Sequence, residues 1–168
     1  MGLLSILDRT RQNHAMEHAT VAVLLEEGAR GPLGGIATPR GFLIFGSLST
    51  EAVTSSAYEG LRRLRGGESE LAVSPYCGTN MVVGALLAAL LSGIIMNRAK
   101  SRARGLPLAM AAIVGATLIK RPLGGAVQRH FTTLATVERS AITSVARTGL
   151  GGITVHWTRT EAGGSPVR

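Results

Sequence analysis

The sequence predicts a membrane-associated protein of the α+β class, organised as a single domain over residues 1–168. Two uncharged apolar runs lie near the middle of the chain, and shorter apolar stretches broken by glycine and proline lie on either side. Only 17% of the residues are charged, against about 25% in soluble domains, and the mean hydropathy is +0.26. We expect an N-terminal motif helix, short β-strands, a central apolar helical hairpin, a C-terminal β-hairpin and a frayed tail at residues 163–168.

Residues 4–28 are expected to form the first helix. Apolar side chains recur along them at helical spacing, and Gly28 is a natural end because glycine readily adopts the conformation that closes a helix. The first turns are amphipathic, a pattern that fits a membrane surface as well as an ordinary core face.

Residues 29–79 are expected to form an α+β segment. Glycine and proline break its first part into turns, around two short strands at residues 36–38 and 41–46 that read as a hairpin. A helix over residues 49–65 follows, with a hydroxyl side chain to cap its start and arginines at its end. Residues 71–73 read as one more short strand.

The apolar helical hairpin is expected over residues 80–119. Its two uncharged runs, residues 81–96 and 106–119, are short against the roughly 20 residues of a bilayer span. Small residues recur in both at every fourth position, which lets helices approach closely in lipid. We therefore expect the lipid bilayer as a partner, location in the cell membrane, and a homo-oligomer or larger membrane complex joined through these faces. The small residues are Gly84, Ala88 and Ser92, beside Ala85, Ala89 and Gly93, then Ala111 with Gly115 and Ala112 with Ala116.

Basic residues gather beside this hairpin. Residues 97–105, between the two runs, hold four basic residues and no acid, and the whole chain carries a net charge of +8. Anionic lipid headgroups explain basic residues next to apolar segments. No aromatic side chains interleave with the cluster, as stacking on nucleic acid requires, so we expect no nucleic-acid partner. The membrane topology stays open, because residues 120–121 place further positive charge at the opposite end.

Residues 120–162 are expected to form the C-terminal strand segment. The Lys-Arg-Pro triplet at residues 120–122 is expected to end the second apolar helix. Two strands at residues 141–147 and 153–160 follow, joined by a glycine-rich turn. Apolar and polar residues alternate in the second strand, a pattern that places His156 on the surface.

An H-x-x-E-H motif, made of His14, Glu17 and His18, lies within the first helix. Positions four apart share a helix face, so the two imidazoles can bind one metal ion, and Glu17 is near enough to accept a proton from water. This is the residue order of the inverted zinc proteases. A catalytic zinc ion also needs a third protein ligand and an open position for water. A hydrogen-bonded polar cluster without a metal is the alternative interpretation.

Cys77, the single cysteine of the chain, is the expected third ligand. Two imidazoles and a thiolate make a tetrahedral zinc set, and the helix after Cys77 presents its positive end to the sulfur, which favours the thiolate. His130, which follows the hairpin, is the alternative third ligand. A small buried hydrophobic side chain is the alternative role for Cys77.

Two stretches resemble a known family. Residues 14–19 read His-Ala-Met-Glu-His-Ala, and residues 74–79 read Ser-Pro-Tyr-Cys-Gly-Thr just before the first apolar run. The chain in these stretches resembles the YqhQ-type group of uncharacterised bacterial membrane proteins, described as predicted metal-dependent enzymes, whose motifs are His-Gly-Ala-Glu-His-Lys and His-Pro-Arg-Cys-Gly-Thr. The resemblance covers roughly residues 10–100 and implies a small membrane protein with a His/Glu/Cys site, in that group or a sister group. Ser74 stands where the family's second motif opens with histidine.

Two functions follow from these patterns. The first is a membrane-associated metal-dependent hydrolase, with a divalent metal, expected to be zinc, held by His14, His18 and Cys77, and with Glu17 as the catalytic residue. The second is a small structural or assembly subunit of a membrane protein complex, in which the His/Glu/Cys cluster serves structure alone. The sequence does not decide whether the protein is an enzyme.

Overall fold

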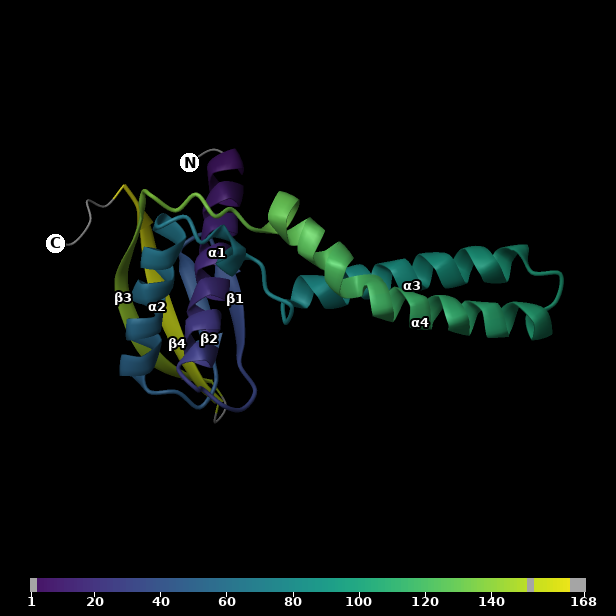
Figure 1. Cartoon of the computed structure of the whole chain (residues 1–168), viewed down its shortest axis with the longest axis horizontal. Helices are drawn as coiled ribbons and strands as arrows, with labels where there is room; N and C mark the ends of the chain where they lie inside the picture. The colour runs from purple at the N-terminus through teal and green to yellow at the C-terminus, as the bar shows by residue number, and fades with distance from the viewer. Residues whose placement is uncertain (1–2, 151–152, 164–168) are drawn as a thin grey trace. The chain divides into compact units, whose positions relative to one another are not determined.

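The computed structural model describes residues 3–150 and 153–163 (Figure 1). The tail expected at residues 163–168 therefore lies outside the described residues apart from its first member. The chain divides into two compact units. The α/β unit comprises Met1–Ser74 and Arg129–Arg168, and the hairpin unit comprises Pro75–Gln128.

Two α-helices, four strands and two short helical turns make up the α/β unit. In chain order they are α1 (Leu3–Glu26), β1 (Gly34–Thr38), β2 (Gly41–Phe45), α2 (Thr50–Arg65), the 3-10 turn η1 (Ser69–Ala72), the π turn η2 (Gln128–Thr132), β3 (Ser140–Leu150) and β4 (Ile153–Ala162).

The strands form one antiparallel sheet in the order β1-β2-β4-β3. The N-terminal hairpin β1–β2 and the C-terminal hairpin β3–β4 therefore meet where β2 pairs with β4. The register places Ile44 opposite His156 and Phe42 opposite Thr158. The expected α+β class and both hairpins are confirmed, and the pairing of the two hairpins is a feature that the sequence did not predict.

Helices α1 and α2 lie side by side over one face of the sheet (Figure 1). The core between the helices and the sheet contains an apolar cluster, in which Met16 and Leu24 of α1 lie with Phe42 and Ile44 of β2. The two helices come closest at Gly60, where an added Cβ would lie 2.9 Å from the carbonyl carbon of Ala19. Glycine at this position lets the backbones of α1 and α2 touch.

Two expectations for this unit are wrong. Residues 71–73 do not form a strand, because the chain there makes η1 and the Ala72 carbonyl accepts a hydrogen bond from the His18 side chain instead of joining a ladder. His156 is fully buried rather than on the surface. His156, Thr158 and Thr160 form the buried row of β4, and the Thr160 hydroxyl donates to Oδ1 of Asn13 in α1. The alternation was therefore correct, but the row that contains His156 faces the helices.

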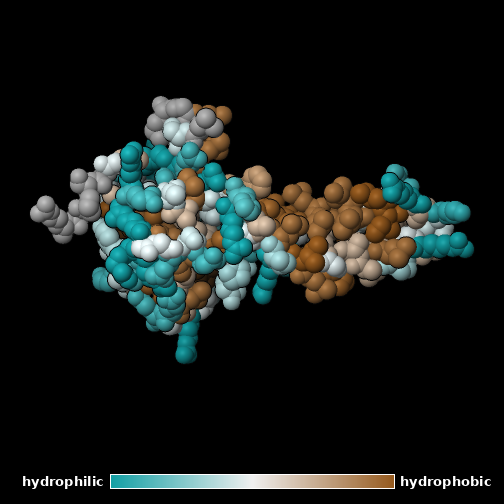
Figure 2. Space-filling model, turned by 45° about the horizontal axis from the view of Figure 1, so that its top comes forward, coloured by the Kyte–Doolittle hydropathy of each residue, from teal (hydrophilic) through white to brown (hydrophobic). Residues whose placement is uncertain are grey.

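The hairpin unit consists of α3 (Gly78–Arg98) and α4 (Arg102–Val127), both long and apolar enough to cross a membrane. Figure 2 shows hydrophobic side chains along most of this hairpin and hydrophilic ones at the end with the connecting loop. The expectation that residues 120–122 end the second helix is wrong, because α4 continues past Pro122. Gly124 lies directly against Asn80 of α3, and Gln128 donates to Oδ1 of Asn80 at 2.9 Å. This packing outweighs the local cost of the proline.

The small residues of α3 fall on two different faces. Gly84 packs on the Lys120 side chain of α4, and Ser92 donates to the Ala109 carbonyl at 3.4 Å, so this face holds the hairpin together. The neighbouring face is exposed, and among the described residues nothing lies within 4 Å of a Cβ built at Gly93. The second face is made of Ala85, Ala89 and Gly93.

We predict that Gly60→Ala destabilises the protein. The new methyl group would overlap the backbone of α1, and overpacking of about 1–3 kcal/mol should outweigh the gain of up to about 1 kcal/mol in helix propensity. Thermal unfolding of the full chain in detergent measures the change. Ser55→Ala, at an exposed position of the same helix, is the matched control. Equal unfolding temperatures for the two variants would contradict the close approach of α1 and α2.

Candidate metal centre

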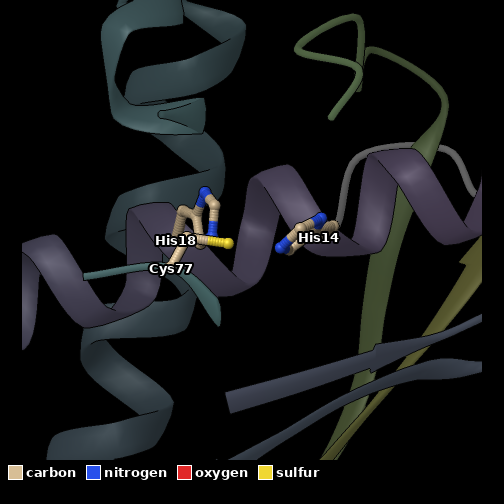
Figure 3. A group of neighbouring side chains, drawn as sticks. All are labelled: His14, His18 and Cys77. Atoms are coloured by element: carbon tan, nitrogen blue, oxygen red, sulfur yellow. The ribbon is translucent and has the colours of Figure 1, made fainter. Parts of the chain in front are cut away.

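The two motif histidines lie on one side of α1 (Figure 3). Their ring centroids are 4.3 Å apart and the ring planes are inclined by 59°. His18 is buried and His14 is half-buried. The spacing of four residues thus places both imidazoles next to each other, as the sequence predicts.

Each imidazole is held by a backbone carbonyl. Nδ1 of His14 lies 2.9 Å from the Thr132 oxygen, and Nδ1 of His18 lies 2.7 Å from the Ala72 oxygen. A carbonyl oxygen can only accept, so Nδ1 carries a proton in both rings, and in the neutral form of each ring Nε2 carries the lone pair. Metal-ligating histidines are typically oriented in this way, with the second ring nitrogen donating to a carbonyl or carboxylate.

Glu17 lies beside this pair, with Oε2 3.9 Å from Nε2 of His14. The carboxyl is buried, and burial raises its pKa from 4.5 to about 7, although the nearby His14 lowers it in part. A carboxyl with a pKa near neutrality can exchange protons at physiological pH. A general-base role for Glu17 stays a prediction.

Gly35 of β1 makes the room for Glu17. A Cβ built on Gly35 would overlap the Glu17 carboxyl group, whereas a Cβ on the preceding Gly34 would meet nothing within 4 Å. The sequence marks these glycines only as turn formers, and no pattern in it distinguishes one from the other. The structure identifies Gly35 as a positioning residue that the sequence did not reveal.

Cys77 immediately precedes α3 and caps its N-terminus. The Thr79 amide donates to Sγ at 3.4 Å, and Sγ donates to the Thr79 hydroxyl at 3.3 Å. His14, His18 and Cys77 each offer one ligand atom, and these atoms lie within 4.8 Å of one another (Figure 3). Two imidazoles and a thiol are a donor set that fits zinc.

His130, the alternative third ligand, is exposed on η2. Its backbone oxygen accepts a hydrogen bond from Arg11 at 3.1 Å, which ties this turn to α1. Its side chain is not a member of the group formed by the two motif histidines and Cys77. The roles of all these residues in metal binding stay predictions.

Comparison with known proteins identifies the family of this α+β protein, which has an apolar hairpin and a His/Glu motif. Residues 9–145 match the family described as "Domain of unknown function (DUF6391)", and the chain belongs to that family. The match includes the motif helix, Cys77 and both hairpin helices.

An uncharacterized protein of Picosynechococcus sp. is 36% identical over 136 residues, which cover 73% of this chain and 65% of that protein. The match thus spans less than two thirds of the relative's length. No solved structure matches the chain. The comparisons establish membership of a bacterial family of unknown function, and the likeness to the YqhQ-type group rests on the two motifs alone.

We predict a pH-dependent stability that originates from Glu17. Between about pH 4.5 and pH 7 the unfolded chain releases the Glu17 proton while the folded chain keeps it. Rising pH therefore favours unfolding in this window, and the loss levels off above pH 7 at about 3 kcal/mol or less. Glu17→Gln, which stays neutral, should lack this decline. Denaturant unfolding in chelator at about pH 5 and about pH 8 measures the difference.

Glu138→Gln removes an exposed carboxylate in the same unit and is the matched control. It should keep the pH dependence of the wild type. If Glu17→Gln shows the same decline in the free energy of unfolding as the wild type, the carboxyl is not held with a raised pKa.

Proposed function

We propose that the protein is a membrane-associated, metal-dependent hydrolase that holds a zinc ion with His14, His18 and Cys77. One observation carries the proposal: backbone carbonyls orient both imidazoles through Nδ1, so that Nε2 is the ring atom of each neutral imidazole that could bind a metal, in a group that includes a thiol.

The dimensions of the group are compatible with zinc. Ligand atoms at about 2.0–2.3 Å from a tetrahedral ion lie about 3.5 Å from one another, so the atoms of this group, which lie within 4.8 Å, would have to move closer together when the ion binds. Three protein ligands leave one coordination position for water or substrate. Zinc supplies Lewis acidity there and makes water easier to deprotonate.

Glu17 would accept the proton of the attacking water and return it to the leaving group. Its carboxyl lies close to His14, and the absence of a side chain at Gly35 leaves room for the carboxyl at this position. A nearby cation favours the ionised carboxylate, so Glu17 would be a base at neutral pH in the metal-loaded protein. In the metal-free protein burial holds its pKa near 7.

The hairpin unit supports a location in the cell membrane. Its helices have the length and apolar composition of membrane spans, and basic residues fill the loop between them. The motifs shared with the YqhQ-type group are consistent with the same class, a membrane protein with a metal site. The substrate would be one that reaches water at or near a bilayer.

We predict that the purified protein binds zinc stoichiometrically and that His14→Ala and His18→Ala each abolish this binding. Cys77→Ser should weaken it at least about tenfold, because a hydroxyl is a poor zinc ligand. Elemental analysis after gel filtration in detergent, with competition by a chromophoric chelator, measures both quantities. His130→Ala is the control that separates the two candidate third ligands, and it should retain the zinc.

A wild-type protein that retains no zinc after loading would overturn the proposal. Loss of zinc in His130→Ala, with retention in Cys77→Ser, would instead assign the third ligand to His130.

A packing role in a larger membrane assembly is the second candidate. The observation that favours it is the exposed face of Ala85, Ala89 and Gly93, which the hairpin itself does not use. Small residues at this spacing allow close helix contacts in lipid. Gly84 and Ser92 contact α4, so substitutions at these positions would disturb the hairpin rather than an assembly.

We predict, for this second candidate, that Gly93→Leu disrupts an oligomer or a co-purifying complex. A leucine there would prevent close approach of a neighbouring helix while leaving the α3–α4 contact intact. Light scattering coupled to size exclusion in detergent measures the mass of the assembly. Thr117→Leu, which adds an apolar side chain at an exposed position of α4, is the control. Equal masses for both variants and the wild type would remove the basis of this role.

A further inference from the structure

A pocket of about 680 Å³ lies in the α/β unit between the start of α1, the β1–β2 turn and β4. It shares no lining residue with the His14, Glu17 and His18 group. Three arginines line it, Arg9, Arg40 and Arg159, together with Trp157. The pocket thus combines positive charge with an aromatic wall.

Arg9 is fixed in the wall of this pocket. Its Nε donates to the Pro39 carbonyl and one of its terminal nitrogens donates to the Thr160 carbonyl, both at 3.0 Å. The backbone around the other two arginines is also held, because the Thr160 amide donates to the Arg40 carbonyl and Arg159 pairs with Gly41 across the sheet. The Arg9 guanidinium is therefore fixed, and Arg40 and Arg159 extend from hydrogen-bonded backbone.

The charges of the pocket are not neutralised within the described residues. Four other arginines of the described chain form ion pairs with carboxylates, but no ion pair joins Arg9, Arg40 or Arg159 to an acid there. Glu161 lines the pocket as well, so three guanidinium groups face one carboxylate. The excess positive charge suits an anionic ligand.

We propose that this pocket binds the phosphate group of an anionic ligand. Guanidinium groups form paired, charge-assisted hydrogen bonds with phosphate oxygens, and more than one can engage a single phosphate. The apolar part of the ligand packs against Trp157, Ile6 and Pro39. The phosphate belongs either to a lipid headgroup or to a soluble phosphate ester. The site is independent of the proposed metal centre.

An apolar row of the sheet reaches this pocket through Trp157. The register aligns Ile36 with Leu43 and Leu43 with Trp157, on the sheet face opposite to Phe42 and Ile44. Ile36 is 54% exposed. A ligand with acyl chains could extend from the arginines along this row, which is the arrangement that a lipid headgroup source requires.

Trp157 is the single tryptophan of the chain, so its fluorescence reports on the pocket directly. The test uses the full chain in a non-ionic detergent without phosphate. It is titrated with sodium phosphate, with monomeric short-chain phosphatidylglycerol, and with sodium chloride at matched ionic strength. We expect a saturable change of emission with phosphatidylglycerol, phosphate or both, and none with chloride. A change with lipid alone identifies a headgroup, and one that includes phosphate identifies a general phosphate site.

Arg159→Gln and Arg40→Gln should each weaken the apparent affinity about tenfold. Arg30→Gln removes the same charge at an exposed residue outside the pocket and should leave the affinity unchanged. Arg40→Lys keeps the charge but not the paired hydrogen bonds, and should fall between the wild type and Arg40→Gln. Thermal unfolding of each variant shows whether it is folded, and either glutamine variant alone suffices for the comparison.

Calorimetric titration with the same three solutes is the second measurement. Absence of both heat and emission change with phosphate and with phosphatidylglycerol would overturn the proposal. An equal response to chloride, or an equal loss of affinity in Arg30→Gln, would also overturn it, because screening of the net charge would then account for the signal. None of these results depends on zinc, so the outcome is separate from that of the metal centre.

Discussion

The hydrogen bonds from two histidine rings to two backbone carbonyls are the contacts on which the candidate site depends. The carbonyls belong to Ala72 and Thr132, and the hairpin unit is inserted in the chain between them. Helix α1 thus holds the chain just before it leaves the α/β unit and just after it returns. Further contacts of α1 with the returning segment, such as the Leu134 amide donating to the Arg11 carbonyl at 3.0 Å, extend the same attachment. The two imidazoles therefore bind the chain on both sides of the hairpin insertion, and these hydrogen bonds place a proton on Nδ1 of each ring.

Burial of Glu17 is the second constraint on the site. An ionised carboxylate is costly in an apolar setting, and the cost appears here as a pKa near 7. The fold accommodates the group because Gly35 leaves space for it. A protein that needed only a stable core would gain from an apolar residue at position 17. The buried carboxyl beside two oriented imidazoles is consistent with a chemical role. Its raised pKa also makes the folded protein more stable at acidic pH than at neutral pH.

The arginines of this chain fall into two groups, those that form ion pairs with glutamates and those without an acidic partner among the described residues. Arginines of α2 pair with neighbouring glutamates, as in Arg62 with Glu59 and Arg63 with Glu68. The loop of the hairpin and the pocket around Arg9 instead gather positive charges without acidic partners among the described residues. Both places suit anionic groups outside the chain, and a bilayer surface with anionic lipids would supply them.

Local patterns in the sequence determined the motif helix, both β-hairpins, the apolar hairpin and the adjacency of His14 and His18, because helical and strand periodicities depend on neighbours in sequence. Tertiary structure decided the rest. Side-chain alternation in β4 says that His156 and Trp157 face opposite ways, but only packing under α1 and α2 decides which face is inside. Helix α4 continues past Pro122, where Asn80 of α3 packs against Gly124 and accepts a hydrogen bond from Gln128. Ala72 and Thr132 contribute to the site through their backbone carbonyls, and Gly35 contributes by leaving space for Glu17. Residue type carries no signal for such roles, since they arise only when distant segments are brought together.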